Sequence, residues 1–126
     1  MSDNTAPSSS TVKRLEEEGE VGADYLEELL DIADLGGDID IDIDHGRASI
    51  AVVASEEGDA RELADLVGRD GEVLEALQEL TRLAVQARTG NRSRLMLDIN
   101  GYRVARRTEL AKIAQEAVKR VLATGE

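Results

Sequence analysis

The chain has 126 residues and a formal net charge of −12, and it contains no cysteine, phenylalanine or tryptophan. The lack of cysteine excludes disulfides, thiol nucleophiles and cysteine metal sites. With Tyr25 and Tyr102 as its aromatic residues, the chain has almost no side chains on which nucleic-acid bases could stack. No apolar run approaches the roughly 18 residues of a membrane-spanning helix, and residues 1–10 have neither the basic nor the apolar region typical of a signal peptide. We therefore expect one cytoplasmic domain with an aliphatic core and no membrane insertion.

The charge is distributed unevenly along the chain. Residues 1–59 carry 3 basic and 17 acidic side chains, a net charge of −14, whereas residues 60–126 carry 12 basic and 10 acidic ones, a net charge of +2. This asymmetry predicts an acidic solvated face, or a surface for a basic partner, and a second half that can meet phosphates. Neither half is basic enough for tight, purely electrostatic binding of nucleic acid.

The N-terminal part of the chain predicts a leader followed by a helix. Residues 1–20 are polar or acidic, and we expect them to form a disordered leader ahead of a domain that spans residues 21–126. Apolar residues recur at a helical period over residues 21–33, and Gly19 and Gly22 are expected to break or fray the start of this helix. Gly36-Gly37 then offers the left-handed stop that helix C-termini prefer.

Two β-type runs follow. Asp and Ile alternate over residues 38–43, and a second run covers residues 48–54 after His45-Gly46, which together predict an antiparallel hairpin. The repeated Asp is also typical of an EF-hand calcium loop, but His45 stands where that loop needs glycine and Ala51 where it needs glutamate. We interpret the run as a half-buried strand with a solvated acidic face. His45 has no nucleophile motif beside it, so we expect neither catalysis nor a metal or cofactor.

A two-glycine turn joins the next two helical segments. Asp59 is expected to cap a short helix over residues 60–67, and a second helix begins near Glu72. The predicted apolar stripe of this second helix consists of Val73, Leu77, Leu80, Ala84 and Ala87. Between the helices lies a Gly-x-x-Gly sequence at residues 68–71, whose glycines allow positive φ angles and whose amides can face anions. Alone, this pattern is weak, because it also serves as an ordinary turn.

The C-terminal part predicts a strand over residues 93–99, with Leu95 and Leu97 on one side, and a long final helix. The predicted apolar face of that helix consists of Val104, Leu110, Ile113, Ala114, Ala117, Val118 and Val121. Five arginines lie nearby in the sequence: Arg92, Arg94, Arg103, Arg106 and Arg107. They form either a second phosphate-binding patch or surface ion pairs with neighbouring carboxylates, among them Asp98 and Glu109, and the sequence leaves both alternatives open.

The element order α-β-β-α-α-β with an extra C-terminal helix, and the glycine turn between the paired helices, resembles a type II KH domain. This is an α+β fold in which a three-stranded sheet packs against helices. Residues 66–80 and 95–107 are similar to the KH domain of the bacterial Jag/KhpB family of RNA-binding proteins, and the Asp-x-x-Gly-Tyr-Arg motif at residues 98–103 is more specific than the glycine turn. The resemblance covers about residues 36–122. The second, C-terminal nucleic-acid-binding domain of that family has a signature in which an arginine lies four positions before a histidine. In this sequence the one histidine, His45, has Ile41 at that position, so the signature of the second domain is absent.

The resemblance implies a non-catalytic module that binds single-stranded RNA. It assigns the RNA backbone to Gly68, Arg69, Asp70 and Gly71, and it assigns an aliphatic floor for bases to Leu66, Val67, Val73, Leu74 and Leu77. It further implies a small KH-domain protein as partner and a role in cell elongation, division and envelope growth. Asp70 departs from the pattern, because its carboxylate lies where a phosphate would bind. The alternative is a protein-interaction module whose loop binds RNA weakly or not at all.

Overall fold

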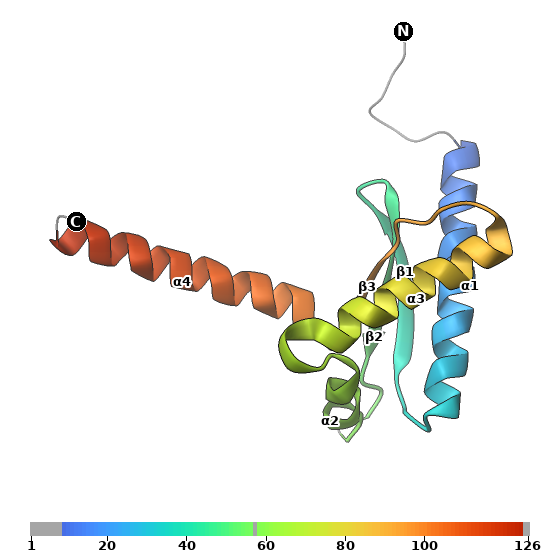
Figure 1. Cartoon of the computed structure of the whole chain (residues 1–126), viewed down its shortest axis with the longest axis horizontal. Coiled ribbons are helices and arrows are strands. Elements are labelled where there is room, and N and C mark those ends of the chain that lie inside the picture. The colour runs from blue at the N-terminus through green and yellow to red at the C-terminus, as the bar shows by residue number, and fades with distance from the viewer. Residues whose placement is uncertain (1–8, 57, 125–126) are drawn as a thin grey trace, which may run out of the picture.

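The computed structural model describes residues 9–56 and 58–124 (Figure 1). Its main elements are α1 (Ser9–Ile32), β1 (Asp38–Asp44), β2 (Arg47–Val53), α2 (Asp59–Leu63), α3 (Glu72–Thr89), β3 (Met96–Ile99) and α4 (Tyr102–Thr124). Two short 3-10 turns, Ala64–Leu66 and Arg69–Gly71, lie between α2 and α3. This order of helices around one three-stranded sheet confirms the predicted α+β, KH-like fold.

The sheet has the strand order β1-β2-β3. β1 and β2 pair antiparallel with Ile41 opposite Ile50, which confirms the hairpin, and β2 pairs parallel to β3 with Ile50 opposite Leu97. Every second residue of β2 is buried, and the residues between them are partly exposed. One face of the sheet is therefore packed and the other is open, as the alternating sequence requires. Asp40 and Asp42 of β1 are exposed, and no cluster of three or more His, Cys, Asp or Glu side chains among the described residues is arranged to hold a metal ion.

Helices α1 and α3 cover the packed face of the sheet and contact each other. The largest fully buried side chains come from the helices, the sheet and the segment before β3: Leu26, Ile50, Val52, Leu63, Leu74, Thr81, Val85, Leu95, Leu97 and Ile99. The approach of α1 to the sheet depends on glycine, because a Cβ on Gly22 would lie 2.7 Å from Cδ1 of Ile50 and one on Gly19 would lie 2.6 Å from Cγ2 of Ile41. The prediction that these glycines break or fray α1 was wrong. They lie within the helix and let it approach the sheet closely.

Helix α1 begins at Ser9, so residues 9–20 belong to it and do not form the expected leader; residues 1–8 of that leader lie outside the described residues. The reason is burial, because Leu15 is in the core and the buried Glu18 accepts a hydrogen bond of 2.8 Å from the Ser93 hydroxyl. At the other end of α1 the left-handed residue is Asp34, with φ of 57°, and not the Gly36-Gly37 pair.

The α2–α3 region differs from the sequence prediction in two details. Asp59 does not cap α2, which ends already at Leu63; its carboxylate instead accepts a hydrogen bond from the N–H of Glu56. The buried face of α3 consists of Leu74, Leu77, Gln78, Thr81 and Val85. The predicted stripe of α3 was correct at Leu77 and elsewhere was displaced by one residue, with Thr81 buried in place of Leu80. Two polar residues with internal hydrogen bonds, Gln78 and Thr81, belong to this buried face.

Helix α4 projects away from the sheet, on the side opposite α1 (Figure 1). Its first two residues, Tyr102 and Arg103, are partly buried, and none of its described residues is fully buried. The predicted apolar face of α4 is therefore largely exposed to solvent. None of the described helices is both long enough and apolar enough to cross a membrane.

Candidate nucleic-acid interface

The turn between α2 and α3 holds Gly68 at φ 75° and Gly71 at φ 80°, with Asp70 also left-handed at φ 54°. A Cβ on Gly68 would lie 2.5 Å from Cγ2 of Val73 and 3.1 Å from its backbone nitrogen. A Cβ on Gly71 would lie 2.8 Å from Cε2 of Tyr102, at the start of α4. Each of the two positions therefore requires glycine for two reasons: the positive φ angle of the backbone and the close packing around it.

Backbone hydrogen bonds tie the turn to the first turn of α3. The carbonyl oxygen of Val67 accepts from the N–H groups of Val73 (3.0 Å) and Leu74 (3.1 Å). The N–H of Gly68 donates to the carbonyl of Ala64 at 3.2 Å. Within the described chain, the N–H groups of the two middle residues, 69 and 70, have no backbone acceptor. Free amides in a left-handed turn of this kind can bind an oxyanion such as a phosphate.

The residues predicted from the sequence to contact RNA all lie in or next to the turn and the start of α3. Some of them are exposed and others are buried. Arg69 and Asp70 are exposed, Leu66 is half-buried, and the side chain of Val73 is 37% exposed. The remaining three aliphatic residues of the expected floor, Val67, Leu74 and Leu77, are in the core. Of these five floor residues, Leu66 and Val73 can therefore offer apolar surface next to the turn, because the other three are buried in the core.

The charges around the turn are mostly negative. Residues 61–75 contain two cations and five carboxylates. One of these carboxylates, Glu75, forms an ion pair of 2.7 Å with Arg103 of α4, whose side chain is 20% exposed. Asp70 has no such partner among the described ion pairs. Its carboxylate therefore opposes a phosphate bound at the free amides, while Arg69 favours it.

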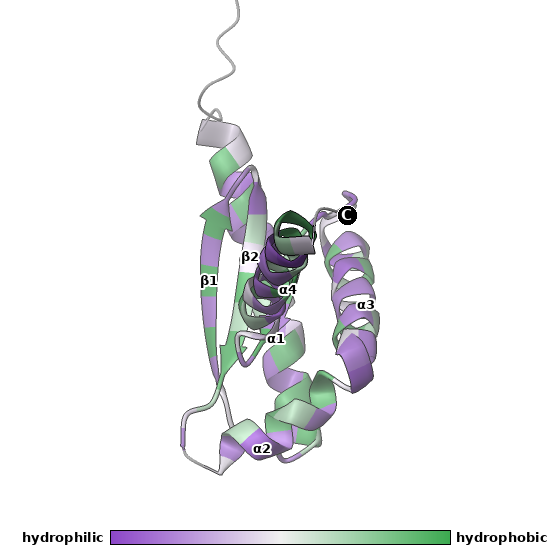
Figure 2. Cartoon of the chain, turned by 90° about the vertical axis from the view of Figure 1, so that its left-hand side faces the viewer, coloured by the Kyte–Doolittle hydropathy of each residue, from purple (hydrophilic) through white to green (hydrophobic). Residues whose placement is uncertain are grey.

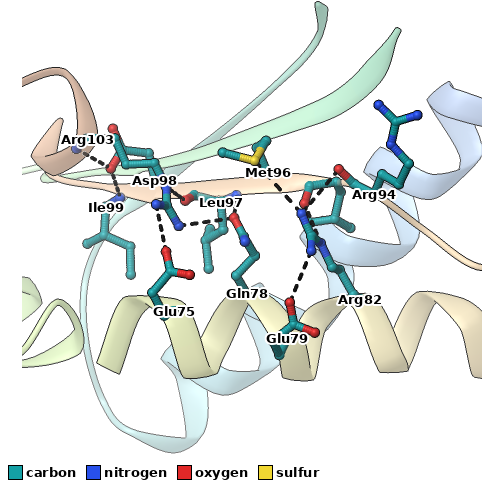
Figure 3. Close-up of polar contacts among 11 residues, drawn as sticks. Glu75, Gln78, Glu79, Arg82, Arg94, Met96, Leu97, Asp98, Ile99 and Arg103 are labelled. Atoms are coloured by element: carbon teal, nitrogen blue, oxygen red, sulfur yellow. Dashed lines mark hydrogen bonds and ion pairs between the residues drawn. The ribbon is translucent and has the colours of Figure 1, made fainter. Parts of the chain in front are cut away.

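A polar network fixes the turn relative to β3 and α4 (Figure 3). The Arg103 guanidinium donates to the carbonyl of Leu97 at 2.7 Å and to Oε1 of Gln78 at 3.1 Å, besides its ion pair with Glu75. The same Gln78 oxygen accepts from the N–H of Leu97 at 2.9 Å. Helix α3, strand β3 and helix α4 are thus joined next to the turn.

The Asp-x-x-Gly-Tyr-Arg motif supplies this junction. The Asp98 carboxylate accepts from the N–H of Arg103 at 3.0 Å, which caps α4, and the Asn100 amide donates to the carbonyl of Ala60 in α2 at 2.9 Å. The ring of Tyr102 lies against Gly71. This supporting role was not predicted from the sequence, although the spacing of Asp, Gly, Tyr and Arg directly after a strand is a signal for it.

The five arginines that follow α3 and β3 form neither one phosphate-binding patch nor one set of ion pairs. Arg103 pairs with Glu75 and is held by the network, and Arg106 lies 3.6 Å from Glu109 within α4. Arg92, Arg94 and Arg107 are exposed and make no ion pair within the described part of the chain. The ion-pair alternative therefore holds for two of the five arginines, with Glu75 in place of the expected Asp98.

No protein-family model matches the chain. The chain is 29% identical over 103 residues to the RNA-binding protein KhpB of Lactiplantibacillus plantarum, an alignment that covers 82% of this chain and 30% of that protein. It is 25% identical over 118 residues to the RNA-binding protein KhpB of Clostridium symbiosum, covering 94% of this chain and 51% of that protein. The chain thus spans between about a third and a half of the length of these relatives.

Proposed function

We propose that this chain is a non-catalytic module that binds single-stranded RNA through the Gly68–Gly71 turn, as in the Jag/KhpB family. The observation that carries the proposal is the geometry of the turn, whose two middle N–H groups lack a backbone acceptor among the described residues. The names of the two relatives support RNA as the ligand. The bases would lie against the exposed part of Val73 and the half-buried Leu66.

The charges predict weak binding that falls with salt. Arg69 is the cation of the turn, and Asp70 beside it repels the phosphate that Arg69 attracts. For single strands, the logarithm of the binding constant falls with the logarithm of the salt concentration by about 0.7 for each neutralised phosphate. One or two contacts at the turn therefore give a slope between about −0.7 and −1.4.

The test is an NMR titration of the isotopically labelled chain with a short single-stranded RNA of mixed sequence, first at low and then at higher salt. We expect shifts centred on residues 68–77 that weaken with salt. Replacing Arg69→Asp should abolish these shifts without unfolding the protein, because the side chain is exposed. The matched control is Arg88→Asp, which makes the same charge change at an exposed position in the last turn of α3.

Any of three results would contradict the proposal. Unchanged RNA affinity in the Arg69→Asp variant would exclude the turn as the site, and equal losses in both variants would show that only the overall charge matters. Shifts confined to α4 would assign binding to the exposed arginines there instead.

The second candidate is a protein-interaction module of the same fold, favoured by the excess of carboxylates around the turn. It predicts no shifts in residues 68–77 with RNA at any salt concentration.

The resemblance to the Jag/KhpB family further supports, as a proposal, a cytoplasmic location, a small KH-domain protein as partner, and a role in cell elongation, division and envelope growth. Depletion in the source organism followed by measurement of cell length tests that role.

A further inference from the structure

Helix α4 carries an apolar stripe that is about half exposed to solvent along its length. Leu110, Ala114, Ala117 and Val121 follow each other at intervals of four, three and four residues, so they share one face. Leu110 and Val121 are each 49% exposed, and the flanking Ile113 and Val118 are 54% and 58% exposed. A helix with this much unpartnered apolar surface marks an interaction site.

The same helix is strongly basic. Its 23 residues contain six Lys or Arg and two Glu, which gives a net charge of +4. Because the whole chain has a net charge of −12, the residues outside α4 have a net charge of −16. Arg107 precedes Leu110 by three positions and Arg120 follows Ala117 by three, which puts both beside the apolar stripe. Lys112 and Lys119 lie on the opposite side of the helix. The face that α4 offers is therefore apolar at its centre and basic at its edge.

A groove with the complementary character runs along the seam between α1 and β1. Its floor is apolar, formed by Ala23, Ile39, Ile41 and Ile43, with Ile41 43% exposed. Its rim is acidic: Glu16, Glu20, Asp24 and Glu27 line it from α1, and Asp38 and Asp42 from β1. No Lys or Arg is among these lining residues. Figure 2 shows the banding of β1, where apolar and polar residues alternate along the strand.

The lengths of the two surfaces also match. The acidic rim on α1 runs from Glu16 to Glu27 and the apolar stripe of α4 from Leu110 to Val121, eleven residues in each case. At 1.5 Å per residue, each spans about 16 Å. The two surfaces cannot meet within one chain, because α4 leaves the sheet after the edge strand β3 and the groove lies at the other edge, along β1 (Figure 1).

We propose that the α1–β1 groove binds helix α4 of a second copy of this chain. The groove and the helix are complementary in apolarity, charge and length, and both belong to every copy. If each of two copies inserts its helix into the other, the assembly closes as a dimer; if the contacts run head to tail, it grows. This contact leaves the Gly68–Gly71 turn out of the interface, so it is independent of the RNA proposal.

The test uses two double charge reversals and the mass measured by sedimentation or light scattering. The helix variant is Arg107→Glu with Arg120→Glu, and its control is Lys112→Glu with Lys119→Glu on the opposite face of α4. The groove variant is Glu20→Lys with Asp24→Lys, and its control is Glu17→Lys with Asp31→Lys, at exposed α1 positions outside the groove. All these side chains are exposed, so each variant should fold, which circular dichroism checks.

We expect the unmodified chain to reach at least twice its 13.6 kDa monomer mass as its concentration rises. The helix variant and the groove variant should each stay monomeric, with a dissociation constant raised on the order of 100-fold, because like charges meet across the contact. Both controls should associate like the unmodified chain. An equimolar mixture of the helix and groove variants should associate again, because each reversed surface then faces its complement.

Three outcomes would overturn the proposal. The first is an unmodified chain that remains monomeric up to millimolar concentration. The second is loss of association in the helix variant but not in the groove variant, which would mean that α4 pairs with another α4 or with a different surface. The third is a mixture of the two variants that fails to associate.

Discussion

The core position of Leu74 can be tested against its neighbour Val73, because both were expected from the sequence to line the floor for bases. Leu74 is 0% exposed in the structure and Val73 is 37% exposed. Truncating a fully buried leucine to alanine removes its transfer free energy and leaves a cavity, which together cost about 3 kcal/mol. At about 4 °C per kcal/mol for a domain of this size, Leu74→Ala should lower Tm by about 12 °C.

Val73→Ala has a much smaller expected cost. It removes two methyl groups worth about 0.8 kcal/mol each when buried, and about two-thirds of that burial exists here, for a loss of about 1 kcal/mol. Alanine regains about 0.5 kcal/mol through its higher helix propensity. The net change of about 0.5 kcal/mol corresponds to about 2 °C in Tm.

The assay combines thermal unfolding followed by circular dichroism with RNA titration well below both transitions. If the structure is right, Leu74→Ala unfolds early but binds RNA normally while folded, and Val73→Ala is nearly as stable as the unmodified chain but binds RNA several-fold more weakly. A fall in Tm of less than about 4 °C for Leu74→Ala, with lost RNA affinity, would refute the reasoning and return Leu74 to the ligand surface.

Three further substitutions test the packing of the turn, of α1 against the sheet and of the Arg103 network, each by chemical or thermal denaturation. Gly71→Ala should cost at least about 2 kcal/mol, because it combines left-handed strain with a collision, whereas Gly90→Ala, with open space around it, should cost only about 1 kcal/mol; equal costs would contradict the close packing at the turn. Gly22→Leu should cost about 3 kcal/mol by forcing α1 off the sheet, and a neutral effect would place α1 elsewhere. Arg103→Ala should cost about 2 kcal/mol and speed amide exchange in the first turn of α4, while Arg106→Ala, which breaks an exposed pair, should change stability by less than about 0.5 kcal/mol; similar effects of the two would argue against the network.

The sequence was sufficient to predict the order of elements, because most elements have a local signal. The Asp/Ile alternation of β1 acts within a few residues, as does Gly90, whose left-handed conformation ends α3. The start of α1 could not be predicted in this way. Glu18 and Gly19 look unsuited to a core helix, and their burial depends on Ser93 and Ile41, which are distant in sequence.

The sequence was sufficient to predict the place of the glycine turn, but not which neighbouring side chains are exposed beside it. The glycine turn was identified correctly as the joint between the paired helices, yet the buried face of α3 was assigned one residue away from its true position. Gln78 is buried because its side chain bonds to Leu97 and Arg103, partners that a helical pattern does not contain. The buried face of α3 therefore includes a polar residue that the pattern could not predict, and it also includes Leu74, which the sequence analysis assigned to the floor for bases.

The net charge of −12 does not by itself oppose RNA at the turn, because most of the acidic residues lie elsewhere. β1, which carries four of them, is separated from the β3 edge by one strand, or about 10 Å, and charges are screened within about 8 Å at physiological salt. The carboxylates of residues 61–75 are closer, and Glu75 among them is paired with Arg103. Within the turn itself the two opposing charges are Asp70 and Arg69. Removing that one carboxylate as Asp70→Asn, which keeps a residue tolerant of positive φ, should strengthen RNA binding more than removing any acid of β1.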